Sequence, residues 1–136
     1  MKFEELIMKQ YNSEKFVDFK LQMEFYKIFG FIYNTKSLNV LFSKLRPDGW
    51  FVFNKNLLII ENKQKNNNKE KGLNQAINYF KIVQENIKKF DFYFNNYFII
   101  IGSGNTENDF GYTIYLINDN KIEKTDMNFK DLKENL

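Results

Sequence analysis

The sequence contains no cysteine and no histidine among its 136 residues. Without cysteine, it can form no disulfide, zinc–thiolate site or thiol nucleophile. Without histidine, it lacks the side chain that most often acts as a general base or binds a transition metal. Any chemistry therefore falls to carboxylates, lysines and tyrosines. Any bound metal would have oxygen ligands, which favours Mg²⁺, Mn²⁺ or Ca²⁺ over Zn²⁺ or Cu²⁺.

Long apolar segments are also missing. No run approaches the roughly 18 consecutive apolar residues that a membrane-spanning helix needs. The first ten residues, MKFEELIMKQ, interrupt their apolar side chains with charges, unlike a signal peptide. We therefore expect a soluble intracellular protein, in the cytoplasm, nucleoid or nucleus, with no membrane partner.

The composition that remains is that of a globular protein. Hydrophobic residues make up 43% of the chain and aromatic residues 18%, enough for a substantial core. The length suits one domain, which we expect to span residues 1–136. The net charge of +3 is mildly basic, which permits a polyanionic partner without requiring one.

Hydrophobic periodicity predicts two long helices and several short strands. The clearest helix covers residues 72–90, where apolar side chains recur at i, i+3, i+4 and i+7. An earlier helix is expected over residues 13–29 and would end at Gly30. Its inward stripe consists of Val17, Leu21, Glu24 and Ile28. Strands are expected at residues 37–45, 50–53, 57–62, 97–101, 112–117 and 121–125, followed by a short tail helix.

The order of these elements predicts an α/β fold with a mixed central sheet of about five strands flanked by helices. The segment Leu57–Ile60 (LLII) is apolar on both faces, which is typical of a central strand covered on each side. The helix between strands 57–62 and 97–101 makes them a βαβ unit. We expect that pair to be parallel, with a right-handed crossover.

Charged residues stand at the ends of the apolar hairpin between residues 48 and 63. If its turn is centred between residues 54 and 55, Asp48 falls opposite Glu61; one residue later, Asp48 falls opposite Lys63. Two carboxylates at the end of a buried strand repel each other and need a divalent cation, the Lys63 ammonium, or both. The alternative is an ordinary solvated strand end with a surface ion pair.

Pro47-Asp48, the apolar hairpin and Glu61-Asn62-Lys63 resemble the PD-(D/E)xK nuclease superfamily. The segment QAINY, from Gln75 to Tyr79, fits the Q-h-x-x-Y signature of its RecB-like branch, which includes the nuclease domains of type I restriction subunits. The resemblance covers residues 13–101. It implies a restriction-endonuclease-like αβββαβ core and a metal-dependent nuclease that hydrolyses phosphodiester bonds, with DNA favoured over RNA as the substrate.

The resemblance also implies a metal site. Asp48 and Glu61 would bind Mg²⁺ or Mn²⁺ through their carboxylates, and the backbone carbonyl of Asn62 would be a third ligand. Many members of the superfamily add an acid or histidine from the first helix. Glu24 is the candidate here because it falls on the inward stripe, and Glu14 is the alternative.

Three further residues receive roles from the same resemblance. Lys63 would position or activate the attacking water and help to neutralise the charge on the phosphate. Gln75 and Tyr79 lie one helical turn apart and would support the site or contact the nucleic-acid backbone. With Asp48 and Glu61, they complete the expected catalytic set.

Basic side chains surround the expected site. Arg46 precedes the hairpin, and Lys65, Lys69 and Lys71 follow it. They could follow a phosphate backbone, which would make binding dependent on salt concentration. The alternative is a solvated loop.

Residues 90–98, FDFYFNNYF, are rich in aromatic side chains. We interpret them as core and sheet edge, with base stacking as the alternative. Lys88 and Lys89, which come just before, are interpreted as ordinary surface residues.

Two other functions remain open at this point. The chain could be a catalytically inactive nucleic-acid-binding module of the same fold, or a small α/β interaction domain whose charged hairpin end is coincidental. A homodimer would suit cleavage of both strands of a duplex.

Overall fold

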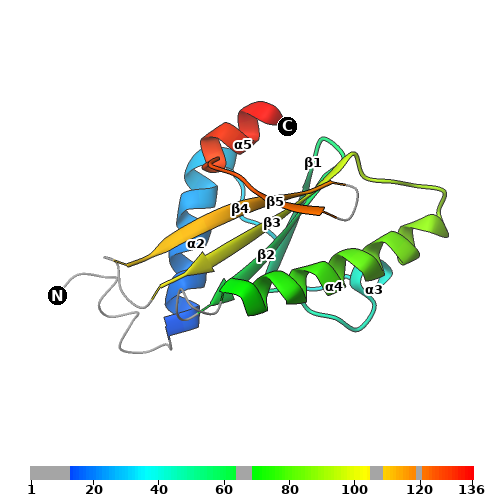
Figure 1. Ribbon diagram of the computed structural model, residues 1–136, viewed down its shortest axis with the longest axis horizontal. Coiled ribbons are helices and arrows are strands. Elements are labelled where there is room, and N and C mark those ends of the chain that lie inside the picture. Colours follow the sequence, from blue (N-terminus) through cyan, green and yellow to red (C-terminus); the bar gives the residue numbers. More distant parts are fainter. Residues whose placement is uncertain (1–12, 64–68, 105–108, 119–120) are drawn as a thin grey trace.

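A computed structural model describes residues 13–63, 69–104, 109–118 and 121–136, without the side chains of residues 13, 14 and 69. Four helices and five strands are seen in this part of the chain (Figure 1). They are, in order, α2 (Ser13–Phe29), α3 (Asn39–Phe42), β1 (Gly49–Phe53), β2 (Asn56–Lys63), α4 (Lys69–Lys88), β3 (Asn96–Ser103), β4 (Gly111–Asn118), β5 (Lys121–Lys124) and α5 (Phe129–Asn135).

The strands form one mixed sheet in the order β1-β2-β3-β4-β5. The β2–β3 pair is parallel and is connected through α4, whereas the other three pairs are antiparallel. The predicted α/β class, the sheet of about five strands and the parallel βαβ pair are therefore confirmed. β2 lies inside the sheet, and every residue of Leu57–Ile60 is buried, as its continuous apolar sequence predicts.

Helices cover both faces of the sheet, with α4 on one side and α2 on the other (Figure 1). Alternate residues of each strand point to opposite faces, so the sheet has two separate cores. The α4 core contains Leu57, Ile59, Ala76, Phe80, Val83, Ile99 and Ile101. The α2 core contains Leu21, Phe25, Phe29, Leu58, Ile60, Ile100 and Phe129.

The bounds of the two long helices agree closely with those predicted from the sequence. α2 ends at Phe29, and Gly30 follows with a φ of +77°, a conformation that glycine adopts without strain. α4 begins three residues earlier than expected and ends at Lys88. None of the described helices is both long and apolar enough to cross a bilayer.

The strand predicted at residues 37–45 is wrong. This segment contains the helical turn α3, in which the Leu41 and Phe42 N–H groups donate to the Leu38 carbonyl at 3.1 and 2.8 Å. The turn buries Phe42 completely and packs its ring edge-on against Trp50. The apolar residues of the segment therefore serve one helical turn that packs beside α4, and they do not alternate between two faces.

A single antiparallel bridge between Asn34 and Trp50 extends the sheet beyond β1. The αβββαβ order implied by the resemblance places three strands before the crossover helix. In the described residues, β1, β2 and this bridge precede α4.

Gly49, the first residue of β1, lies beneath the ring of Tyr33. A β-carbon added to Gly49 would approach two atoms of that ring to 2.5 and 2.6 Å. The ring cannot easily move aside, because Tyr33 is 1% exposed and its hydroxyl donates a hydrogen bond to Asp18. The close packing of this loop on the hairpin therefore requires glycine.

We expect Gly49→Ala to lower the free energy of unfolding by about 1–3 kcal/mol, the usual cost of overpacking a core. Urea denaturation measures the change. Gly111→Ala is the matched control, because a β-carbon there would meet no atom within 4 Å. The control should change stability by less than about 0.5 kcal/mol. Equal losses in the two variants would contradict this account of Gly49.

Candidate functional site

The hairpin register decides which residues face each other at its open end. Gly49 pairs with Ile60, so Asp48 lies opposite Glu61 and not opposite Lys63. The first of the two registers allowed by the sequence is therefore confirmed.

The end of β2 presents three polar residues to two different faces. Glu61 and Lys63 continue the face covered by α4, and Asn62 continues the face covered by α2. Glu61 is 3% exposed and Asn62 2%, whereas Asp48 beside them is exposed. An exposed carboxylate and a buried one thus lie opposite each other at the open end of the hairpin.

The start of α4 fixes Lys63. The Lys63 Nζ donates a hydrogen bond of 2.5 Å to the Gln75 Oε1 and lies 3.9 Å from the Glu61 Oε2. Gly72 allows this approach, because a β-carbon there would meet the aliphatic stem of Lys63 at 3.0 Å. Lys63 is therefore a positioned cation, and Gln75 is the residue that holds it.

Tyr79 also reaches the site from α4. Its hydroxyl donates to the backbone carbonyl of Arg46 at 3.2 Å. Burial raises the pKa of Tyr79, and the neighbouring Glu61 carboxylate raises it further. The structure thus brings together five of the residues predicted from the sequence: Asp48, Glu61, Lys63, Gln75 and Tyr79.

The environment of Glu61 strongly disfavours its charge. Burial raises the pKa of Glu61 to about 8, and the charge of Asp48 and hydrogen bonding to it add to the rise. The Lys63 ammonium and hydrogen bonding from Tyr79 partly oppose it. The Glu61 Oε1 is buried and has no hydrogen-bond partner. The site therefore contains an acceptor oxygen that no protein donor satisfies.

Asn62 connects Asp48 to the end of β2 through its backbone. The Asn62 N–H donates to the Asp48 Oδ2 at 2.8 Å. In a strand, the N–H and C=O of one residue point to the same side. The Asn62 carbonyl therefore faces the Asp48 side of β2, where it was predicted to serve as a ligand.

On the other face, the structure reveals a residue that was not predicted. The Asp18 Oδ1 accepts a hydrogen bond of 2.8 Å from the Asn62 side chain and one of 2.6 Å from the Tyr33 hydroxyl. Burial raises the pKa of Asp18, and these two hydrogen bonds oppose the rise. Gly102, which pairs with Asn62, leaves room for this cluster, since a β-carbon there would lie 2.9 Å from the Asn62 Oδ1.

Glu24 does not join these residues. It pairs with Lys27 at 3.4 Å and lines a shallow hollow beside Tyr112 and Asp126. The predicted stripe on α2 is confirmed for Val17 and Leu21 and wrong for Glu24 and Ile28, because the buried side chains recur every four positions. They are Val17, Leu21, Phe25 and Phe29. The side chain of Glu14, the alternative acid, lies outside the described residues.

The predicted basic residues are only partly described. Arg46 and Lys71 have exposed side chains, consistent with contact to a polyanion or with a solvated surface. Lys65 and the side chain of Lys69 lie outside the described residues.

These residues fit a magnesium ion. No group of three or more Asp, Glu, His or Cys side chains converges as metal ligands within the described part of the chain. Mg²⁺ does not require one, because it usually binds one or two carboxylates together with waters and phosphate oxygens. Asp48, Glu61 and the Asn62 carbonyl would provide such a set, and the unpartnered Glu61 oxygen would then coordinate the cation.

No protein-family model matches the chain, and no curated protein matches it. A function is therefore inferred from the geometry of these residues.

The raised pKa of Glu61 predicts a pH-dependent stability in the absence of divalent metal. The folded state holds this proton up to about pH 8, whereas an unfolded glutamate releases it near 4.5. The wild-type protein should therefore lose stability relative to Glu61→Gln as pH rises from about 4.5 to 8, by up to about 1.4 kcal/mol per pH unit. Urea denaturation in chelator at pH 5, 6, 7 and 8 measures this difference.

The comparison isolates Glu61, because both proteins retain Asp18. A difference that stays constant across this pH range would show that Glu61 titrates normally.

The Asp18 cluster can be tested with two substitutions. Asp18→Leu leaves the Tyr33 hydroxyl and the Asn62 amide without their acceptor, so the free energy of unfolding should fall by about 2 kcal/mol or more. Asp18→Asn keeps an acceptor oxygen and removes a buried charge, so its loss should stay below about 1 kcal/mol. Urea denaturation at pH 7 distinguishes them, and equal losses would exclude the proposed hydrogen bonding.

Proposed function

We propose that the protein is a metal-dependent nuclease of the PD-(D/E)xK type, which hydrolyses phosphodiester bonds in nucleic acid, with DNA as the preferred substrate. The observation that carries the proposal is the environment of Glu61. This buried carboxylate, with one unpartnered oxygen, lies between the exposed Asp48 carboxylate and the Lys63 ammonium.

The two carboxylates repel each other, and a divalent cation bound between them would be favourable. Their mutual repulsion contributes to the raised pKa of Glu61, and a cation between them would remove that repulsion. Phosphodiester hydrolysis places additional negative charge on a group that already repels nucleophiles. A bound Mg²⁺ would supply positive charge next to the attacking and leaving oxygens.

In this function, Lys63 would act on the substrate. Gln75 fixes its ammonium group beside Glu61, so the charge is in place before a phosphate arrives. From this position it can donate a hydrogen bond to the attacking water or to a phosphate oxygen. Tyr79 binds the backbone of Arg46 and thereby connects the segment before Asp48 to α4.

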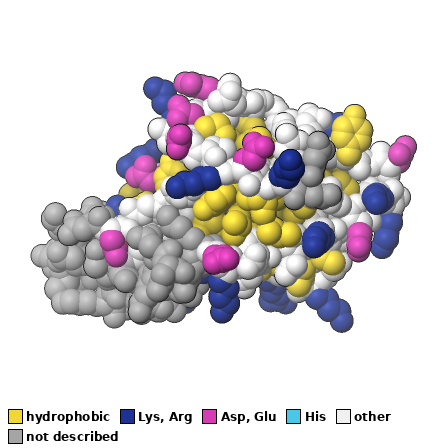
Figure 2. Space-filling model, in the orientation of Figure 1, with side chains coloured by type: hydrophobic (Ala, Val, Ile, Leu, Met, Phe, Trp, Pro, Cys, Tyr) yellow, Lys and Arg dark blue, Asp and Glu magenta, His cyan; other side chains and the backbone are white. Residues whose placement is uncertain are grey.

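The surface around the site supports a polyanionic partner. Figure 2 shows Lys and Arg side chains along the edge of the molecule where α4 lies, with some acidic side chains between them. Arg46 and Lys71 are exposed near the two ends of the hairpin. A homodimer would place two such sites on the two strands of a duplex.

The experiment is a cleavage assay with single-stranded, duplex and branched DNA and with RNA. Mg²⁺ or Mn²⁺ should support cleavage, and chelator should abolish it. Glu61→Gln and Lys63→Ala should each lower the rate by about 10²-fold or more, the usual cost of losing a group that stabilises transition-state charge. Glu123→Gln, on the exposed part of β5, is the control and should cleave at the wild-type rate.

Each other outcome has a defined meaning. Cleavage that survives both substitutions would exclude the proposed site. Salt-sensitive binding without cleavage would indicate an inactive binding module, and absence of both would favour an interaction domain. Mn²⁺ should also raise the melting temperature of the wild type by mass action, and Asp48→Ala should lose this shift.

A further inference from the structure

A second surface lies at the far end of α4, where the chain passes from Lys88 to β3. The core interpretation of residues 90–98 is confirmed for Phe94, Tyr97 and Phe98, which are 6–8% exposed. It is wrong for the other three aromatic residues of the segment. Phe90 is 64% exposed, Phe92 39% and Tyr93 68%. We call these three side chains, together with Lys55, Lys88 and Lys89, the Tyr93 surface.

The Tyr93 surface is held in place by the sheet. The backbone carbonyl of Lys55, in the β1–β2 turn, accepts a hydrogen bond from the Asn95 N–H at 2.7 Å. The Lys55 ammonium lies 4.7 Å from the ring centre of Tyr93 and 5.2 Å from that of Phe92. Phe92 in turn packs edge-on against the buried Phe94, with ring centres 5.1 Å apart. The exposed rings of Phe92 and Tyr93 therefore have defined contacts with Lys55 and Phe94.

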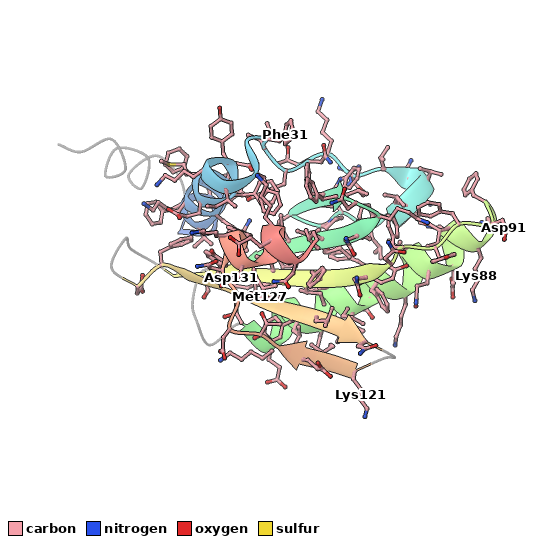
Figure 3. All side chains as sticks on the ribbon, turned by 90° about the horizontal axis from the view of Figure 1, so that it is seen from above. Phe31, Lys88, Asp91, Lys121, Met127 and Asp131 are labelled. Carbon is pink, nitrogen blue, oxygen red and sulfur yellow. The ribbon has the colours of Figure 1, made fainter. Side chains whose placement is uncertain are left out.

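Positive charge surrounds these rings. Lys55, Lys88 and Lys89 are all exposed, and Asp91 offsets part of their charge. Figure 3 shows Lys88 and Asp91 at one end of the molecule, far from Met127 and Asp131 near α5. Proteins that bind single-stranded nucleic acid combine exposed aromatic side chains with positive charge.

We propose that the Tyr93 surface binds a single strand of nucleic acid. Bases would stack on Tyr93 and Phe90, and the neighbouring ammonium groups would contact phosphates. A protein partner that covered the rings with apolar side chains would leave the surrounding lysines without an anionic partner. A continuous duplex keeps its bases stacked on each other and offers no free face to the rings.

This inference deepens the proposed nuclease function and depends on it for the choice of nucleic acid as partner. At about 1.5 Å per residue, roughly 20 Å of α4 separate Gln75 from Lys88. At about 3.4 Å per stacked nucleotide, a strand of roughly six nucleotides covers that length. The substrate would then be a single strand, or a duplex with a single-stranded extension.

The test measures binding without cleavage. Fluorescence anisotropy in chelator gives the Kd for a labelled 12-nucleotide single strand and for a blunt duplex of the same sequence. Tyr93→Ala should raise the Kd for the single strand about 5-fold or more, the effect of losing one stacked base. The Kd for the duplex should change by less than about 2-fold, because the substitution alters no charge.

Three further variants separate stacking from other effects. Tyr93→Phe keeps the ring and should bind as the wild type does. Tyr26→Ala removes a tyrosine of similar exposure, 56%, on α2, and should also bind normally. Lys88→Gln should reduce the salt dependence of single-strand binding by about 0.7 in the log–log slope, whereas Tyr93→Ala should leave that slope unchanged.

Three results would overturn the proposal: unchanged single-strand binding by Tyr93→Ala, equal weakening for strand and duplex, or no binding of either oligonucleotide by the wild type. The outcome is distinguishable from failure of the nuclease site. If cleavage depends on Glu61 but Tyr93→Ala binds normally, only the Tyr93 surface is excluded. If Tyr93→Ala weakens single-strand binding but no cleavage occurs, the surface stands and the nuclease proposal fails.

Discussion

The burial of the Glu61 carboxylate is the constraint around which the rest of this molecule is arranged. β2 is covered by helices on both faces, so a carboxylate near its end is removed from water and its pKa rises to about 8. The hairpin register adds Asp48 opposite, which increases the cost of the charge. Lys63 provides partial compensation, and it is itself held by Gln75. An arrangement that disfavours its own ionised form is suited to a cation that the protein does not itself provide.

The same constraint has a counterpart on the opposite face of the sheet. Because successive strand residues alternate, burying Glu61 toward α4 also buries Asn62 toward α2. The Asp18 carboxylate accepts hydrogen bonds from the Asn62 side-chain N–H and from the Tyr33 hydroxyl, which connects α2, the following loop and β2. Two glycines make this cluster possible, Gly49 beneath Tyr33 and Gly102 beside Asn62. α2 and α4 are thus both connected to the end of β2 by polar contacts.

Local patterns in the sequence predicted most of the fold and most of the candidate site. Helix periodicity, the apolar run of β2 and the spacing of Asp48, Glu61 and Lys63 all depend on near neighbours. The predictions were wrong where tertiary contacts determine the local structure or the burial of a side chain. Residues 37–45 form a helical turn because Phe42 packs against Trp50, which no local pattern shows. Asp18 was missed because it lies beside the apolar stripe of α2, and only its long-range contacts with Tyr33 and Asn62 mark it out. The aromatic run at residues 90–98 has no periodicity that separates its buried rings from its exposed ones.

The change in exposure from Asp48 to Glu61 has a consequence for what can enter. Asp48 is exposed to solvent, whereas Glu61, which lies opposite it, is only 3% exposed. Only a species about the size of a water molecule or a small ion can reach the inner carboxylate without displacing packed side chains. The exposed Asp48 and the buried Glu61 therefore differ in the size of the species that each can meet without a rearrangement of the fold.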